Sequence, residues 1–377
     1  MKIFFSCGGT AGHINPALAI AAGIRKRKPE AEIVFGGSRG GMEEGLVAAA
    51  GYEIVTIPMQ GLSRKLTPKG IWHNAKTLCY LMRAVPSAKQ ILLEHAPDAV
   101  IGTGGFACFP FLYAAHSLGI PTMLHESNAL VGKTTKFLQN RCDRILIGFD
   151  AARKCFKDPA KPVWTGNPIT ADMTLRRDAV REKYGLPKDM PVVLSAWGSL
   201  GAREMNRHMA DYFACAEKDD TFLHIHATGK FGKKWFPELL HERGIDRPNT
   251  DVREYIENLA EVMQGADLIL CRAGAMTMTE VCCAGLPAII VPSPNVSENH
   301  QEENARALEA QGAAEVILEA DCSGALLYAR VRELLDSPDV RARMRSAGHG
   351  MAVWDAEERI WKELCDLLRE KSEKVAD

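Results

Sequence analysis

Three polar side chains lie at spacings that suit the binding of a nucleotide sugar. Thr277 lies in the first turn of a helix expected to begin near Ala275, and Glu280 lies about one turn further on. Because a helix N-terminus attracts anions, this helix and the Thr277 hydroxyl could bind phosphate. Glu280 would repel a diphosphate, so it is better suited to accept hydrogen bonds from a ribose diol. Gln301, within the polar run 299–304, suits sugar hydroxyls.

A strand–helix–strand unit is expected to position these groups. Apolar strands are predicted at 267–271 and 288–291, and the helix between them ends at Gly285, a favoured C-cap residue. Such a helix begins at the carboxyl end of a parallel sheet, where open α/β sheets bind their ligands. The alternative is that Glu280 is an ordinary helix carboxylate and that 299–304 is a solvated loop.

His13 follows a glycine-rich turn near the start of the chain. Residues 2–7 are a predicted strand, and Pro16 lies near the start of the helix that follows the turn. A strand, a glycine turn and a helix in this order begin many phosphate-binding α/β folds. His13 could donate to a phosphate or act as a base, because imidazole titrates near neutral pH. The alternative is a helix-start histidine bonded to the backbone.

Two further turns are expected at the same edge of this sheet. A predicted strand at 98–102 leads into Thr103-Gly104-Gly105, where the backbone lets a ligand approach closely. A strand at 122–124 delivers His125, Glu126, Ser127 and Asn128 to the edge. Glu126 is a second candidate base, provided that burial raises the pKa of its carboxyl group.

The chain is long enough for two domains, and its two halves begin alike. A strand at 191–197 is followed by a second glycine turn, 198–202, and a helix. Apolar residues at helical spacing in the tail predict a last helix that packs back on the structure. We therefore expect an α/β fold of two Rossmann-like domains facing across a cleft, with boundaries 1–166, 167–350 and 351–377.

Composition excludes several function classes. The 46 Lys and Arg balance 47 Asp and Glu, so nucleic acid is not an expected partner. The 11 cysteines include no Cys-x-x-Cys pair, which fits neither a zinc site nor a disulfide framework. The first residues lead directly into a strand, so we expect no signal peptide, and no apolar run approaches the length of a membrane span.

Basic and apolar residues alternate irregularly between Gly61 and Gln90. Such a mixture suits the surface of an anionic bilayer. An amphipathic helix packed on the core would give the same pattern and is the simpler interpretation. The residues concerned are Lys65, Leu66, Lys69, Ile71, Trp72, Lys76, Leu78, Tyr80, Leu81, Met82, Arg83 and Lys89.

The order of the motifs resembles a known enzyme family. The motifs are GGTAGHINPALAIA from Gly8, GTGGF from Gly102, HESNAL from His125, GSLGA from Gly198 and CRAGAMTMTE from Cys271, followed by HQEENA. This order resembles the MurG family, the bacterial lipid-intermediate N-acetylglucosaminyltransferases of peptidoglycan synthesis. The resemblance covers essentially the whole chain and implies the GT-B fold, with the C-terminal helix returning to the N-terminal domain.

The resemblance also implies a reaction and a location. GlcNAc would pass from UDP-GlcNAc to the C4 hydroxyl of MurNAc in undecaprenyl-pyrophosphoryl-MurNAc-pentapeptide, with inversion. The protein would lie peripherally on the cytoplasmic face of the cell membrane. The implied donor contacts are Thr10, Gly12, Asn128, Thr170, Ser199, Ile256, Ala275, Met276, Thr277, Glu280 and Gln301. The implied acceptor contacts are Gly9, Thr10, Ala11, Gly12, His13, Gly104, Gly105, His125 and Asn128, and the candidate catalytic residues are His13 and Glu126.

Three positions depart from the family pattern. Thr170 stands where an arginine usually follows Gly-Asn-Pro, so Arg176 or Arg177 could take over donor binding. Trp197 replaces a glycine, and Ser127 replaces a glutamine.

No Asp-x-Asp metal motif occurs, so we expect transfer without metal or other cofactor, with a helix N-terminus stabilising the leaving diphosphate. Three alternatives stay open. A nicotinamide-dependent oxidoreductase is disfavoured, because the second strand ends in Gly36-Gly37-Ser38 and carries no acidic residue for the ribose. A non-catalytic nucleotide-sugar binding module would bind UDP-GlcNAc without turnover. A related glycosyltransferase would use another lipid acceptor, such as a diacylglycerol.

Overall fold

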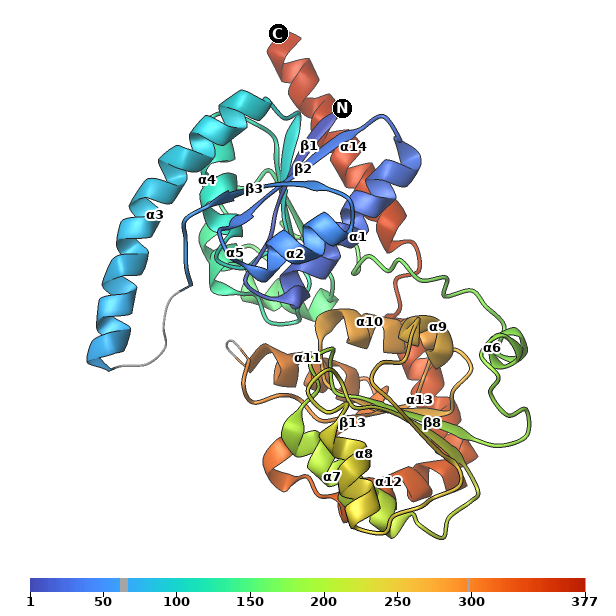
Figure 1. Ribbon diagram of the computed structural model, residues 1–377. Helices are drawn as coiled ribbons and strands as arrows, with labels where there is room; N and C mark the ends of the chain where they lie inside the picture. The colour runs from blue at the N-terminus through green and yellow to red at the C-terminus, as the bar shows by residue number, and fades with distance from the viewer. Residues whose placement is uncertain (62–66, 297–298, 377) are drawn as a thin grey trace. The chain divides into compact units, whose positions relative to one another are not determined.

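The computed structural model describes residues 1–61, 67–296 and 299–376. The chain divides into two compact units. The first unit comprises residues 1–170 together with the C-terminal segment from Val353, and the second unit comprises Ala171–Ala352. Each unit contains one parallel β-sheet (Figure 1).

The sheet of the first unit has seven strands in the order β3-β2-β1-β4-β5-β6-β7, and all paired neighbours are parallel. The chain starts in the middle of the sheet and builds outward in both directions, as doubly wound folds do. The strands are β1 (Lys2–Ser6), β2 (Glu32–Ser38), β3 (Glu53–Ile57), β4 (Ala99–Gly102), β5 (Thr122–Glu126), β6 (Arg144–Ile147) and β7 (Val163–Trp164).

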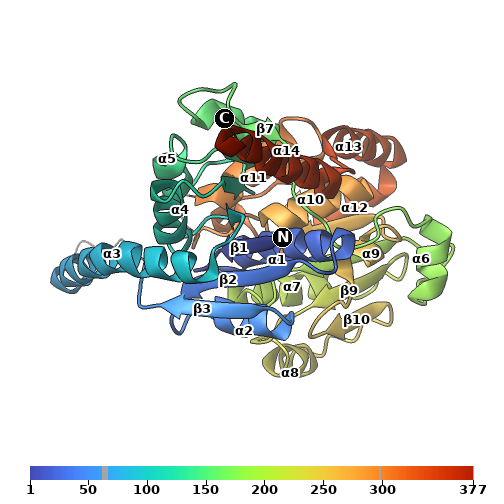
Figure 2. The ribbon, with the colours of Figure 1, turned by 90° about the horizontal axis from the view of Figure 1, so that it is seen from above.

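Helices cover both faces of this sheet, because successive strand residues point to opposite sides. Ile3 and Phe5 of β1 pack into one hydrophobic cluster with α1 and α14, whereas Phe4 packs into the other with α3 and α4. Both views show α3 and α4 on the opposite side of the sheet from α14 (Figures 1 and 2). The helices are α1 (Ala11–Arg27), α2 (Met42–Ala49), α3 (Pro68–His95), α4 (Cys108–Ser117), α5 (Lys133–Leu138), the 3-10 helix Asp150–Cys155 and α14 (Ala356–Ala376).

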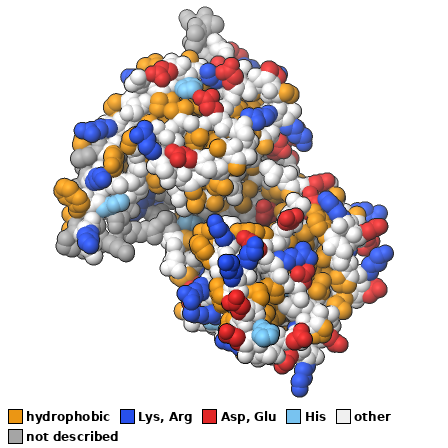
Figure 3. Space-filling view, viewed as in Figure 1, with side chains coloured by type: hydrophobic (Ala, Val, Ile, Leu, Met, Phe, Trp, Pro, Cys, Tyr) orange, Lys and Arg blue, Asp and Glu red, His pale blue; other side chains and the backbone are white. Residues whose placement is uncertain are grey.

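Helix α3 buries one face and exposes another. Ala88 and Leu92 are buried in the cluster with α4. Ile71 (64% exposed), Trp72 (75%) and Met82 (65%) lie at the surface among exposed basic residues. Hydrophobic and basic side chains alternate along the left edge of Figure 3, where Figure 1 places α3. We call the exposed residues Lys69, Ile71, Trp72, Lys76, Met82 and Arg83 the α3 patch.

The α3 patch is only part of the predicted basic and apolar segment. Lys65 and Leu66 lie outside the described residues, and so do the side chains of Leu78 and Leu81.

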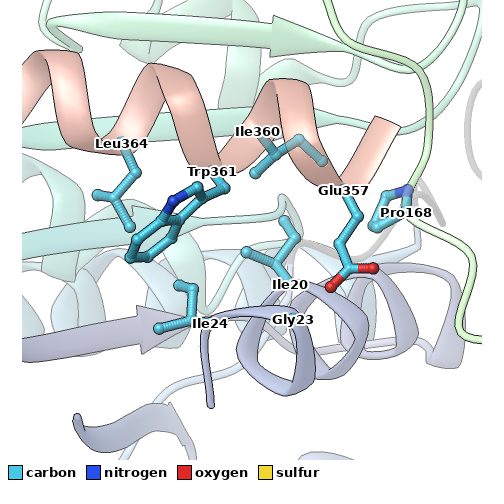
Figure 4. A pocket seen from close by; sticks show the side chains of 8 residues that line it. All are labelled: Ile20, Gly23, Ile24, Pro168, Glu357, Ile360, Trp361 and Leu364. Atoms are coloured by element: carbon cyan, nitrogen blue, oxygen red, sulfur yellow. The ribbon is translucent and has the colours of Figure 1, made fainter. Parts of the chain in front are cut away.

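The C-terminal helix α14 packs against α1. Ile360 and Leu364 are buried in one cluster with Ile20 and Ile24, and Trp361 packs on its edge (Figure 4). Arg27 and Glu357 form an ion pair of 2.5 Å at the start of α14. The tail of the chain is therefore an integral layer of the first unit.

The second unit repeats the plan with six parallel strands in the order β10-β9-β8-β11-β12-β13. Its core joins strand residues such as Leu268 and Ile289 to Met209 and Phe213 of α7. The strands are β8 (Val192–Ala196), β9 (Leu223–Ala227), β10 (Thr250–Arg253), β11 (Leu268–Cys271), β12 (Ala288–Ile290) and β13 (Ala314–Val316). The helices are α6 (Arg177–Lys183), α7 (Arg203–Cys215), α8 (Trp235–Glu242), α9 (Leu259–Met263), α10 (Ala275–Ala284), α11 (His300–Glu309), α12 (Gly324–Asp336) and α13 (Pro338–Met351), with the 3-10 helix η3 (Glu319–Asp321).

The two helix-covered parallel sheets confirm the α/β class and the two Rossmann-like units. Helix α10 begins at Ala275, and its C-cap Gly285 has φ 56°, in the left-handed region that favours glycine. Within the described ranges, no helix combines the length and apolar character needed to cross a membrane.

Candidate functional site

A cavity of about 690 Å³ lies at the carboxyl ends of β8, β9 and β11 in the second unit. This position is where open α/β sheets bind ligands, and the volume suits a small-molecule site. Four of the predicted donor residues line it: Ser199, Ile256, Thr277 and Gln301.

Two helices begin at the wall of this cavity. Ala202 is the N-cap of α7 and Gly274 is the N-cap of α10, and neither supplies a side-chain hydrogen bond to its helix. The first-turn amides of an α-helix have no partner within the helix, so both helix ends offer N–H donors and a positive dipole end. Two such ends at one cavity form a strong candidate site for a diphosphate.

The glycine turn before α7 permits a close backbone approach. Gly201 has φ +76°, and a Cβ atom there would lie 2.1 Å from the Thr228 carbonyl oxygen. The turn thus packs directly on the end of β9, and Ser199 is brought to the cavity wall.

An ion pair forms another part of the wall. Arg272, at the end of β11, pairs with Glu319 and donates to the carbonyl oxygens of Val291 (3.0 Å) and Pro292 (3.2 Å). The family resemblance gave neither Arg272 nor Glu319 a role. Pairing between residues 47 positions apart leaves no local signal in the sequence.

Gln301 is held in one orientation at the cavity. Its Oε1 accepts a hydrogen bond of 2.8 Å from the amide of Ser293, which also lines the cavity. Because Oε1 is engaged by the backbone, the Nε2 amide group is the part of Gln301 that can donate to a ligand.

Glu280 lies on α10, one turn beyond Thr277, and is half-buried. It is not among the residues that line the cavity, and neither are Ala275 and Met276. Burial raises the pKa of the Glu280 carboxyl to about 7. A carboxyl group with this pKa is partly protonated at neutral pH.

In the first unit, His13 contacts the turn after β4. Its Nδ1 lies 3.2 Å from the Thr103 carbonyl oxygen, and the Thr103 hydroxyl donates to the His13 carbonyl oxygen at 2.6 Å. A Cβ atom at Gly104 would lie 2.9 Å from His13 Nδ1, and one at Gly105 would lie 2.1 Å from the Gly8 carbonyl oxygen. These two glycines, predicted to let a ligand approach, make room for the His13 ring and the first glycine turn.

The first glycine turn has a partner that sequence reasoning missed. The carboxylate of Glu43 is fully buried and accepts from the Gly9 amide (3.3 Å) and from the amide and hydroxyl of Ser38 (2.8 and 2.5 Å). The Gly9 amide is thus engaged within the protein. The first-turn amides of α1, at Ala11 and Gly12, have no partner within the helix and are the candidate donors to an anion.

Glu126 and His125 are also engaged within the protein. Glu126 is 3% exposed and accepts hydrogen bonds from the Asn128 amide and side chain, the Gly132 amide and the Thr135 hydroxyl, at 2.8–3.2 Å. A carboxylate with four donors organises its loop, which favours His13 as the base.

His125 is fully buried, and burial lowers the pKa of its imidazole. Its Nε2 donates to the Gly166 carbonyl oxygen at 3.1 Å, and its Nδ1 lies 3.3 Å from the Ser127 hydroxyl. Both ring nitrogens thus have partners in the first unit. Ser127, which stands where the family usually has a glutamine, is one of these two partners.

The other two positions that depart from the family pattern, Trp197 and Thr170, lie in different environments. Trp197 is 3% exposed, packs in the core of the second unit and lines the cavity. Thr170 and Arg176 are exposed. Arg177 pairs with Asp267 at 2.7 Å, at the amino end of β11 and so at the edge of the sheet opposite the cavity. This geometry argues against Arg177 as a donor-binding substitute.

The remaining predicted contacts lie in the first unit: Thr10 and Gly12 at the exposed start of α1, and Asn128, which is 9% exposed, after β5. Among the described residues, no cluster of three or more His, Cys, Asp or Glu side chains could hold a metal ion. Metal-independent transfer stays a prediction.

Two family models match the chain. The glycosyltransferase family 28 N-terminal domain matches residues 3–147, and the glycosyltransferase family 28 C-terminal domain matches residues 192–360. The first match lies within the first unit, and the second match covers most of the second unit and extends to residue 360, in the C-terminal segment of the first unit.

Relatives match the chain from end to end. A protein of Acetivibrio thermocellus, named UDP-N-acetylglucosamine--N-acetylmuramyl-(pentapeptide) pyrophosphoryl-undecaprenol N-acetylglucosamine transferase, is 41% identical over 99% of this chain and 100% of its own length. A protein of the same name from Desulfitobacterium hafniense is 40% identical, over 96% of this chain and 97% of its own length.

The crystal structure of MurG from Acinetobacter baumannii is similar, with a TM-score of 0.76 and 26% identity over 98% of this chain and 99% of that chain. The chain therefore belongs to glycosyltransferase family 28 and, within it, to the MurG family.

Proposed function

We propose that the protein transfers GlcNAc from UDP-GlcNAc to undecaprenyl-pyrophosphoryl-MurNAc-pentapeptide (lipid I), forming lipid II in peptidoglycan synthesis. The observation that carries the proposal is the 41% identity with the Acetivibrio thermocellus transferase over the whole of both chains. The cavity of the second unit, with two helix N-termini at its wall, supports it independently.

The donor occupies this cavity in the proposal. The diphosphate lies at the N-termini of α7 and α10, near the hydroxyls of Ser199 and Thr277. The backbone at Ile256 meets the uracil. Gln301 donates from Nε2 to a GlcNAc hydroxyl oxygen, because its Oε1 is engaged by Ser293.

Glu280 lies one turn beyond Thr277 of the cavity wall, so in the proposal the ribose extends past the wall to reach it, and the diol pairs with the Glu280 carboxylate once that group is ionised. Two hydrogen bonds from the diol to the carboxylate favour its charged form, so donor binding and deprotonation support each other. The Glu280 pKa of about 7 in the free protein then makes donor affinity depend on pH near neutrality.

The transfer is a single displacement with inversion. The C4 hydroxyl oxygen of MurNAc forms a bond to C1 of GlcNAc, and the bond from C1 to the UDP phosphate oxygen breaks. His13 accepts the hydroxyl proton at Nε2, and UDP departs with the bonding electron pair. The helix N-termini at Ala202 and Gly274 stabilise the charge that develops on the leaving diphosphate.

The α3 patch binds the cytoplasmic face of the cell membrane in the proposal. Exposed Ile71, Trp72 and Met82 enter the lipid interface, and Lys69, Lys76 and Arg83 pair with anionic headgroups. Peripheral attachment of this kind suits an enzyme whose acceptor carries a polyprenyl chain.

The test measures UDP release from UDP-GlcNAc with and without a short-chain analogue of lipid I, for the wild type and Glu280→Ala. We expect release that depends on the acceptor and falls strongly in the variant. UDP-GlcNAc binding without release would instead indicate a different acceptor or a non-catalytic binding module. Release that is unchanged in Glu280→Ala would remove this residue from the donor site.

A further inference from the structure

Thr103 contacts His13 through two different groups. The Thr103 hydroxyl donates to the His13 carbonyl oxygen at 2.6 Å, and the Thr103 carbonyl oxygen lies 3.2 Å from His13 Nδ1. Thr103 itself is only 1% exposed, so its two groups are largely shielded from water. A single residue at the end of β4 thus holds both the backbone and the ring of His13.

The second contact determines which nitrogen of the ring carries the proton. A carbonyl oxygen can only accept a hydrogen bond, so Nδ1 of His13 is the donor. In the neutral imidazole the basic lone pair then belongs to Nε2. This is the protonation state that a histidine needs in order to accept a proton at Nε2.

The backbone around the ring restricts its position further. A Cβ atom at Gly104 would lie 2.9 Å from His13 Nδ1, and one at Gly105 would lie 3.1 Å from His13 Cδ2. Both glycines have positive φ values, +95° and +80°, a backbone conformation that favours glycine and that brings the turn against the imidazole. The ring therefore lies against backbone on the side of Gly104 and Gly105.

We propose that Thr103 is a positioning residue for the transfer reaction, which orients His13 and fixes its Nδ1–H tautomer. The inference rests on the proposed function, in which His13 is the base. The Thr103 hydroxyl secures the first turn of α1 against the end of β4, and this keeps His13 Nδ1 within reach of the Thr103 carbonyl oxygen. Loss of the hydroxyl lets that turn move and releases the ring.

The experiment compares Thr103→Val with Thr103→Ser in the full chain. Valine keeps the β-branched shape and removes the hydroxyl, whereas serine keeps the hydroxyl. With the lipid I analogue, Thr103→Val should lower kcat about tenfold, because a displaced base loses much of its effect. KM for UDP-GlcNAc should stay unchanged, because the proposed donor cavity lies in the second unit. Thr103→Ser should recover most of the lost kcat.

A double-mutant cycle separates positioning from a merely structural effect. If Thr103 acts only through His13, adding Thr103→Val to His13→Gln should cost no further activity. The imidazole ¹⁵N spectrum, with His13 assigned by its loss in His13→Gln, should show the Nδ1–H tautomer in the wild type and in Thr103→Ser. It should show a mixture of tautomers in Thr103→Val.

Several outcomes would overturn the inference. One is full kcat in Thr103→Val. Another is a loss of activity that is just as large when Thr103→Val is added to His13→Gln as when it is added to the wild type. The third is an unchanged His13 tautomer in Thr103→Val. Wild-type turnover by His13→Gln would instead refute the role of His13 as the base, and the role of Thr103 with it. If the wild type releases no UDP with this acceptor, the proposed function fails, and the spectrum still decides whether Thr103 sets the tautomer.

Discussion

The buried carboxylate of Glu43 lies 3.3 Å from the amide of Gly9 and accepts its hydrogen bond. The same carboxylate accepts from the amide and hydroxyl of Ser38, so one side chain joins the turn after β1 to the last residue of β2. The glycine turn that precedes His13 is thus held by the protein itself.

Substitution of Glu43 should destabilise the first unit. Glu43→Gln places an amide NH₂ among N–H donors and leaves one of them without an acceptor, which should cost about 1–3 kcal/mol of unfolding free energy. Urea unfolding measures the loss. The control is Glu44→Gln, whose carboxylate accepts from the Gly40 amide near the surface and which should change stability by less than about 0.5 kcal/mol. Equal effects in the two variants would contradict the assigned role of Glu43.

Donor affinity should weaken as the pH falls through about 7. The Glu280 carboxyl has a pKa of about 7 in the free protein and must be ionised to accept both hydroxyls of a ribose diol. Calorimetric titration with UDP-GlcNAc between pH 6 and 8 should show weaker binding at the acidic end. Glu280→Gln should bind weakly at every pH and lose this dependence. A wild-type affinity that is constant across the range would exclude the carboxylate–ribose contact.

The Glu280 carboxyl should also make the folding stability depend on pH, and its raised pKa determines the direction. Burial raises the Glu280 pKa from 4.5 to about 7, so the folded state binds more protons than the unfolded state between these values. Stability from this group is present at low pH and is lost as the pH rises through that range. Glu280→Gln should therefore match the wild type near pH 4.5 and exceed it by about 1–3 kcal/mol at pH 8. Urea unfolding at the two pH values tests the sign.

Gln301 should contribute more to recognition of the sugar than to recognition of the nucleotide. Gln301→Glu keeps the oxygen that accepts from the Ser293 amide and replaces the NH₂ donor that faces the ligand. KM for UDP-GlcNAc should rise about 10–100-fold, because the sugar hydroxyl oxygen loses its N–H donor and the new carboxylate adds negative charge to the diphosphate cavity. Affinity for UDP should fall less than this, because UDP lacks the sugar and is affected only by the added negative charge. A parallel loss of UDP affinity would show that the substitution disturbs the whole cavity.

The α3 patch should control binding to anionic vesicles. Trp72→Glu removes the most exposed aromatic side chain of α3 and adds a negative charge, which the anionic headgroups repel. The vesicle partition coefficient should therefore fall about tenfold. Leu93→Glu is the matched control, since Leu93 is 62% exposed on the same helix but outside the patch. Co-sedimentation with phosphatidylglycerol vesicles measures both. Equal binding by the two variants would place the membrane contact elsewhere.

The packing of α14 on α1 should contribute strongly to the stability of the first unit. Leu364 is fully buried against α1, so Leu364→Ala should cost about 2–5 kcal/mol. Lys362 is exposed on the same helix, and Lys362→Ala should change stability by less than about 0.5 kcal/mol. Hydrogen exchange of α1 amides should accelerate in the first variant only. Unchanged protection of α1 would mean that α14 adds little to its stability.

Local signals in the sequence predicted the elements well. The helix from Ala275 to Gly285 carries its own start and stop residues, so the sequence located both ends of α10. Short apolar runs likewise identified strands such as β4, β11 and β12, whereas β3, β7 and β13 were not predicted. These features depend on neighbours in the chain, which is why they can be read without a structure.

The uses of polar and glycine residues were harder to predict. Gly104 and Gly105 carry the positive φ values expected of a turn, yet the space they leave is filled by His13 and Gly8. Glu126 looks like a candidate base in the sequence, but four donors surround it in the folded chain. Glu43 gave no signal, because its partner Gly9 lies 34 residues away. Each of these contacts joins segments that are distant in the chain.

The place of α14 in the first unit has a consequence for biosynthesis. The segment from Val353 completes a core that begins at Ile3, while the whole of the second unit is encoded between them. During translation, the apolar stripe of α1 that includes Ile20 and Ile24 stays uncovered by α14 until that helix has left the ribosome. The N-terminal half of the nascent chain thus offers a transient site for chaperones, whereas the second unit can fold as soon as its own segment has emerged.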